Sequence, residues 1–131
     1  MAGGEAKSGA VTVLSGRRVL VVEDEFFLAD DMAHVLRALG AEVAGPVPTS
    51  DQALALLAAE PIDATVLEIN LKGRMVFPVA DALRERGIPF VFATGYDQSA
   101  VPAAYQDVPR WEKPFDPHKL SRALPSFAPR T

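Results

Sequence analysis

The sequence predicts an α/β fold, in which a parallel sheet carries helices on both of its faces. From Arg17 onward, short apolar runs alternate with amphipathic segments of helical length, and this alternation is typical of βα units. The chain has 131 residues, of which 49% are hydrophobic and 23% are charged, so it can bury the core of one globular domain. We therefore expect a single doubly wound domain.

Five apolar runs are the candidate strands: Val19–Val22, Glu42–Val47, Ala64–Ile69, Pro89–Ala93 and Val108–Glu112. The third run is almost continuous in apolar side chains, as strands buried on both faces are. It carries one charged residue, Glu68, near its carboxyl end. A buried charge is costly unless it is paired, so Glu68 is out of place in a purely structural strand.

Helices are predicted where apolar positions recur at helical spacing. The first covers residues 28–39 and is closed by Gly40, the second covers Ser50–Glu60, and the third ends at Gly87. A last helix is expected after Asp116, because this residue can cap a helix whose first position is a proline.

Local signals refine these elements. Thr49 and Gln52 stand at the first and fourth positions of a capping box, in which each side chain bonds to the backbone N–H of the other residue. Glu25 is interpreted as the N-cap of the first helix, where a carboxylate suits the helix dipole. Pro102 restricts the segment 98–105 to one short turn of helix.

Composition excludes several classes of function. With 13 Lys and Arg against 17 Asp and Glu, a net charge of −4 and a pI near 5.1, the chain lacks the basic surface that binds nucleic acid directly. It has no cysteine, which excludes disulfides, thiolate zinc sites and cysteine nucleophiles. No apolar run approaches the ~18 residues of a spanning helix. We expect no membrane contact and a cytoplasmic location.

The chain divides into three predicted parts. Residues 1–16 are rich in Gly, Ala and Ser and predict a flexible N-terminal leader. Residues 17–125 form the predicted domain. Residues 126–131 remain as a C-terminal tail that is too short to fold.

Polar residues gather where the predicted strands end. Glu23 and Asp24 follow the first strand, Glu68 lies near the end of the third, Thr94 ends the fourth and Lys113 follows the fifth. Because ligands of a parallel α/β sheet bind at the carboxyl ends of its strands, we expect these five side chains to share one crevice. Crowded carboxylates favour a hard cation such as Mg²⁺, and Lys113 would neutralise an anion that completes the site.

Three motifs in the chain resemble those of the receiver domains of bacterial two-component response regulators. They are VLVVEDE at 19–25, FATG at 92–95 and KPF at 113–115. The resemblance covers residues 17–124 and implies a flavodoxin-like (βα)5 fold with the strand order 2-1-3-4-5. The run FATGY at 92–96 is similar to a subgroup of receivers that often occur without an output domain, so the resemblance implies a stand-alone receiver.

The resemblance also assigns roles at the crevice. It implies that Asp24 binds Mg²⁺ directly with help from Glu23, and that Asn70 offers its backbone carbonyl. It implies that Thr94 and Lys113 each contact an oxygen of a phosphoryl group. The implied partners are a sensor histidine kinase or phosphotransfer protein and a downstream protein. The implied chemistry is at most autocatalytic phosphotransfer, so we do not expect an enzyme.

Two residues depart from the family pattern. Glu68, also a predicted metal ligand, stands where the family has its phosphoryl-accepting aspartate, and Arg110 stands where the family usually has Tyr or Phe. The extra methylene of Glu68 moves the carboxylate outward by about 1.5 Å. A misplacement of about 1 Å can cost roughly a hundredfold in rate, so efficient phosphotransfer to Glu68 is not expected.

The sequence leaves two interpretations of Glu68 open. In one, the longer carboxylate reaches Lys113 or Thr94 and imitates the phosphorylated state, with one negative charge in place of nearly two. In the other, the substitution leaves the site inert. It is equally open whether Glu68 is natural or was introduced in place of an aspartate.

Other functions and candidate residues fit less well. A flavodoxin-like cofactor carrier shares this type of sheet, but the acidic run 23–25 would repel the phosphate that such a protein binds after its first strand. A pure interaction module overlaps with the receiver if Glu68 has abolished phosphotransfer. His34 and His118 lack a second ligand at metal spacing and are interpreted as surface or helix residues.

Overall fold

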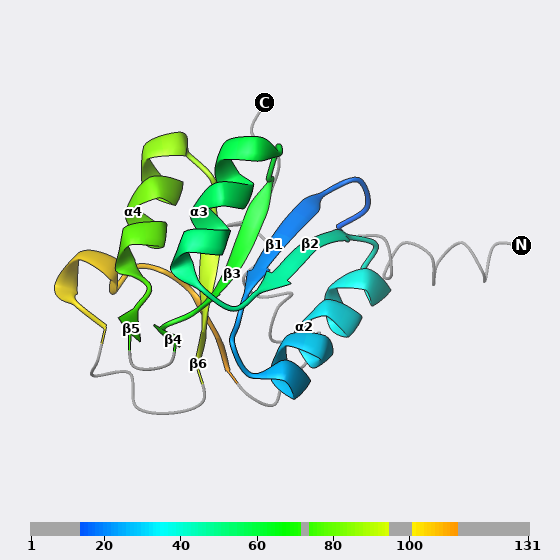
Figure 1. Cartoon of the computed structure of the whole chain (residues 1–131), viewed down its shortest axis with the longest axis horizontal. Coiled ribbons are helices and arrows are strands. Elements are labelled where there is room, and N and C mark those ends of the chain that lie inside the picture. The colour runs from blue at the N-terminus through cyan, green and yellow to red at the C-terminus, as the bar shows by residue number, and fades with distance from the viewer. Residues whose placement is uncertain (1–13, 72–73, 95–100, 113–131) are drawn as a thin grey trace, which may run out of the picture.

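A five-stranded parallel sheet forms the centre of the computed structural model, which describes residues 14–71, 74–94 and 101–112 (Figure 1). The strands are β1 (Arg18–Val22), β2 (Glu42–Val47), β3 (Ala64–Glu68), β6 (Phe90–Thr94) and β7 (Arg110–Glu112). They are ordered β2-β1-β3-β6-β7, and every neighbouring pair is parallel. The predicted fold class and the strand order 2-1-3-4-5 are confirmed.

Helices cover both faces of the sheet. The helices are α2 (Phe26–Ala38), α3 (Ser50–Ala59) and α4 (Phe77–Arg86). Figure 1 shows α3 and α4 side by side, with α2 on the other side of the strands. Among the described residues, no helix combines the length and the apolar character needed to cross a membrane.

The alternation of side chains along the strands divides the core into two layers. Val19 and Val21 of β1 are fully buried in the layer that contains Met32 of α2. Leu20 of β1 is fully buried in the opposite layer, which contains Leu83 of α4. Because both faces of the central strands are covered, their sequences are apolar at nearly every position, as predicted.

One element was not predicted. The short strands β4 (Asn70–Leu71) and β5 (Arg74–Met75) form an antiparallel pair directly after β3. Strands of two residues have no apolar run of their own, so hydrophobic periodicity cannot reveal them. The predicted short turn of helix near Pro102 is present as the 3₁₀ helix η2 (Ala103–Tyr105).

The predicted helix caps are largely present. The Glu25 Oε1 atom accepts a hydrogen bond from the N–H of Leu28 at 2.9 Å, so Glu25 caps α2 as expected. Thr49 caps α3 by accepting from the N–H of Gln52 at 3.1 Å. The second half of the predicted capping box differs, because the Gln52 side chain accepts from the Thr49 hydroxyl at 3.0 Å.

The folded part of the chain begins earlier than predicted. Leu14, which the sequence assigned to the flexible leader, is only 2% exposed and packs in the α2 layer of the core. Its N–H donates to the carbonyl of Leu39 at 2.9 Å, and its carbonyl accepts from the N–H of Arg17 at 2.9 Å. The apolar patch at 10–14 is too short to show helical or strand periodicity, so the burial of Leu14 is decided by tertiary packing.

The connection between β6 and β7 is anchored by Tyr105. This side chain is 8% exposed and stacks on Phe77 of α4 with ring centroids 5.0 Å apart. Its hydroxyl donates to Asp81, and the Arg84 guanidinium lies 5.0 Å from the ring centroid. Arg84 also pairs with Asp107 at 2.9 Å. Tyr105 therefore ties the connection to α4.

We expect Leu14→Ala to lower the free energy of unfolding by about 2–4 kcal/mol, because it removes a buried side chain and leaves a cavity. Urea denaturation measures this change. Ser15→Ala, at the adjacent exposed position, is the matched control and should change stability by less than about 0.5 kcal/mol. Equal small effects of the two substitutions would show that Leu14 does not contribute to the core.

We expect Tyr105→Phe to destabilise the protein at neutral pH by about 0.5–1.5 kcal/mol, the usual net value of one hydrogen bond. The hydrogen bond to Asp81, together with burial, raises the pKa of Tyr105 above 10.0. The neutral phenol is thus favoured by folding, so its contribution is present below pH 10 and is lost as the pH rises through the raised pKa. Denaturation curves should show the difference between the two proteins shrinking above that pH. A difference independent of pH would contradict this assignment.

Candidate functional site

Strand register brings two of the predicted acidic residues to one level of the sheet. Val22 of β1 pairs with Leu67 of β3, so Glu23 and Glu68 follow at the same level on adjacent strands. Glu68 in turn pairs with Ala93 of β6. The carboxyl ends of β1, β3 and β6 therefore share one edge of the sheet, which is where the sequence predicts a site.

Of the remaining predicted residues, Thr94 and Asn70 are located by the pairing of their backbones, and Lys113 lies outside the described residues. Thr94 pairs with Glu112 of β7, one step past Ala93 along β6. The Asn70 backbone pairs with Met75 in the β4–β5 hairpin. Lys113 lies outside the described residues, so its predicted role at this edge stays a prediction.

The turn between β1 and α2 holds Glu23 and Asp24 in different surroundings. Glu23 is 3% exposed, and its Oε2 atom accepts from the N–H of Glu25 at 2.9 Å. Its own N–H donates to the carbonyl of Val47 at 3.0 Å, so the turn is also tied to β2. Asp24 is half-buried. The turn thus orients Glu23 inward and leaves Asp24 accessible to solvent ions.

Glu68 lies where β3 emerges from the core. The four preceding residues of β3 are buried, whereas Glu68 is half-buried. The residue as a whole reaches the surface, although the Oε1 atom of its carboxylate is buried. The position explains how a nearly continuous apolar strand can end on an acid.

The predicted metal ligands at this edge are of the type that Mg²⁺ prefers, because all of them are carboxylate or carbonyl oxygens. Within the described ranges, however, no group of three or more His, Cys, Asp or Glu residues is arranged to hold a metal ion. The predicted carboxylate set of Glu23, Asp24 and Glu68 is therefore not assembled in this structure. Mg²⁺ usually retains several waters and takes only one or two carboxylates, so a smaller set suffices chemically.

Arg110 and Trp111 lie on opposite faces of β7. The Arg110 guanidinium donates to the carbonyl of Val108 at 2.9 Å and lies 3.5 Å from the carbonyl of Gln106. Trp111 is fully buried in the core layer of α2. Arg110, at the position where the family usually has Tyr or Phe, therefore binds carbonyls of the segment that connects β6 to β7. Trp111, the only aromatic residue of β7, lies in the core.

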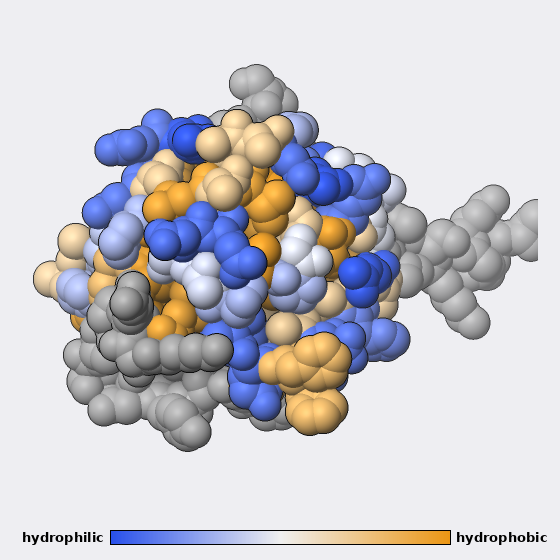
Figure 2. All heavy atoms as spheres, viewed as in Figure 1, coloured by the Kyte–Doolittle hydropathy of each residue, from blue (hydrophilic) through white to orange (hydrophobic). Residues whose placement is uncertain are grey.

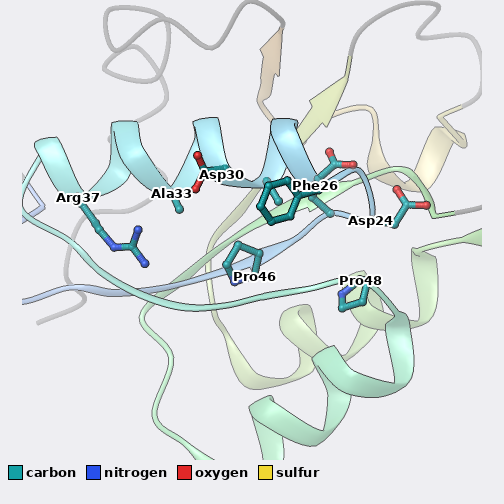
Figure 3. Close-up of a pocket in the computed structure, with 9 residues that line it drawn as sticks. Asp24, Phe26, Asp30, Ala33, Arg37, Pro46 and Pro48 are labelled. Atoms are coloured by element: carbon teal, nitrogen blue, oxygen red, sulfur yellow. The ribbon is translucent and has the colours of Figure 1, made fainter.

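Sequence reasoning did not find a pocket beside this edge. The pocket has a volume of about 340 Å³ and lies between α2 and the end of β2, with Glu23 and Asp24 at its border (Figure 3). The available signal was the pair Phe26–Phe27, two large apolar residues next to an acidic turn. His34 is exposed on α2, as predicted, and His118 lies outside the described residues.

Comparisons with known proteins identify relatives along most of the chain, although no family model matches it. SdrG of Sphingomonas melonis Fr1 is 38% identical, with a TM-score of 0.78, over 85% of this chain and 95% of SdrG. A CheY-like response regulator receiver domain from Methylobacillus flagellatus is 25% identical, with a TM-score of 0.73, over 86% of this chain and 98% of that domain.

A curated relative is longer than this chain. The sensory transduction protein LytT of Bacillus subtilis is 30% identical over 114 residues, which is 84% of this chain and 47% of LytT. The chain thus spans about half the length of that protein. Because the identity to SdrG extends over nearly all of that protein and the fold is that of a CheY-like receiver, this chain belongs to the response regulator receiver domains of two-component signalling.

Proposed function

We propose that this chain is a receiver whose acceptor position does not undergo efficient phosphotransfer, because Glu68 replaces the aspartate of the family. The observation that carries the proposal is the register of β1 and β3, which sets Glu68 level with Glu23 at the carboxyl edge. The proposed partners are a sensor histidine kinase or phosphotransfer protein and a downstream protein. Because the chain belongs to the receiver domains, we do not propose the alternative function of a flavodoxin-like cofactor carrier.

Each residue of the proposed site has a distinct task. Asp24 and Glu23, with the backbone carbonyl of Asn70, would hold Mg²⁺, whose positive charge would neutralise phosphoryl oxygens. Thr94 would donate a hydrogen bond to one phosphoryl oxygen, and Lys113 would pair with another. Glu68 would present its carboxylate about 1.5 Å too far out for in-line attack. In this proposal, the acceptor position is the part of the site that prevents efficient phosphotransfer.

The receiver type and the limits of the domain are also proposals. The FATGY run at 92–96 supports membership of the subgroup that often lacks an output domain. The structure of SdrG in a BeF3-activated conformation, 38% identical to this chain, supports the proposal that a chain of this type has an activated state. We propose that the receiver domain ends near residue 125 and that residues 126–131 form a tail. The cytoplasmic location stays a prediction.

We expect Mg²⁺ to bind saturably at this edge and Asp24→Asn to weaken binding by at least about tenfold, equal to about 1.4 kcal/mol. The fluorescence of Trp111 can report binding, because Trp111 pairs with Ala93, which pairs with Glu68. Asp31→Asn removes the same charge from an exposed position on α2 and is the matched control. An unsaturable titration, or equal effects of both substitutions, would refute the site.

We expect Glu68→Asp to gain phosphorylation, because the shorter side chain restores in-line geometry without changing its neighbours. Incubated with Mg²⁺ and acetyl phosphate, the variant should add one phosphoryl group by intact mass. The phosphoryl group leaves acetate and bonds to a carboxylate oxygen of the new aspartate, so hydroxylamine should release it. The parent chain and Glu68→Gln should add little.

Two further results decide this proposal. Adding Asp24→Asn to Glu68→Asp should abolish the gain, because the metal that neutralises the transferring group is lost. Robust phosphorylation of the parent on Glu68 would show that the pocket accommodates the longer acceptor. No gain in Glu68→Asp would show that other departures, such as Arg110, have disabled the site.

A further inference from the structure

The pocket between α2 and the end of β2 is an open groove with apolar walls. Ala29 and Ala33 line it from α2, and Pro46 and Pro48 line it from β2 and the residue after it. In Figure 3, Phe26 leans over Pro46 from the start of the helix. None of these side chains can form a hydrogen bond with a ligand, so the middle of the groove suits an apolar occupant.

Exposed aromatic residues extend the apolar surface of the groove at the start of α2. Phe26 and Phe27 are 73% and 75% exposed, and their rings meet edge to face with centroids 5.3 Å apart. They form the apolar patch at the start of α2 in Figure 2. Exposed patches of this kind typically mark contact surfaces for other proteins, and Phe is enriched in such interfaces.

Charges of opposite sign stand at the two ends of the groove. Asp24 and Asp30 lie toward the start of α2, whereas Arg37 lies in its last turn and extends toward β2 (Figure 3). The Arg37 guanidinium forms no hydrogen bond or ion pair with any other described residue. From Phe26 to Arg37 the helix advances by about 16 Å, which matches roughly five residues of extended peptide.

We propose that this groove docks a peptide segment of a partner protein, with an acidic side chain at Arg37, a basic side chain at Asp30 and Asp24, and apolar residues between them. The opposed charges define the direction of the segment, and the apolar walls supply the contact area. The length of the groove and the adjoining exposed aromatic pair favour a peptide over a compact small molecule. The proposal does not depend on phosphotransfer at Glu68.

A peptide-display selection on the full chain tests the proposal. A library of linear 12-residue peptides, selected without Mg²⁺, should yield sequences with one acidic and one basic residue separated by apolar residues. Titration of one synthesised peptide, followed by NMR, should shift the amides of Ala33 and Arg37. Omitting Mg²⁺ keeps the result independent of the proposed metal site, which shares Asp24 with the groove.

Charge-reversal variants identify the binding surface. Arg37→Glu and Asp30→Lys should each weaken binding of the peptide at least about tenfold. Asp31→Lys, an equal change at the next residue, which does not line the groove, should have little effect. The double variant Arg37→Glu/Asp30→Lys should prefer a peptide with its two charges exchanged. Both substituted positions are exposed, so folding should be preserved.

Three outcomes overturn the proposal. A selection that yields no binding peptide would do so, as would peptides that bind both single charge-reversal variants as tightly as they bind the parent chain. Shifts at Ala33 and Arg37 caused by small-molecule fragments but not by the peptides would show that the groove takes a small ligand instead.

Discussion

Burial of both faces of the sheet determines the register of its strands, and the candidate site depends on that register. Val19 and Val21 must face α2 while Leu20 faces α3 and α4, so a shift of β1 by one residue would turn its apolar side chains to the wrong layers. The same register sets Glu23 level with Glu68. Site geometry is thus a consequence of core packing, and no residue of the site has to specify it.

The turn between β1 and α2 links the core to two different surfaces. Glu25 caps the helix and, through its own N–H, holds the Glu23 carboxylate inside. Asp24, between them, remains accessible and borders both the carboxyl edge and the groove. A ligand that approaches Asp24 from either side therefore meets the same charge, so the proposed metal binding and the proposed peptide docking would share a residue through which they could influence one another.

The connection from β6 to β7 is held by contacts far from that turn. Tyr105 packs against Phe77 and bonds to Asp81, while Arg110 donates to the carbonyl of Val108. The contacts of Tyr105 attach the connection to α4, and the hydrogen bond of Arg110 attaches the start of β7 to the residues that precede it. In this chain the aromatic anchor comes from the connection, and the aromatic residue of β7, Trp111, is committed to the core.

The sequence by itself determined the order of the elements, the bounds of β2, the caps Glu25 and Thr49, and the edge at which acidic residues gather, because hydrophobic runs and capping residues act over a few neighbours. Only the tertiary structure decided that Leu14 belongs to the core, that Tyr105 bonds to Asp81, and that α2 and β2 enclose a groove. Each of these joins segments that are separate in the chain. Their contacts arise from packing of whole elements, which local pattern does not encode.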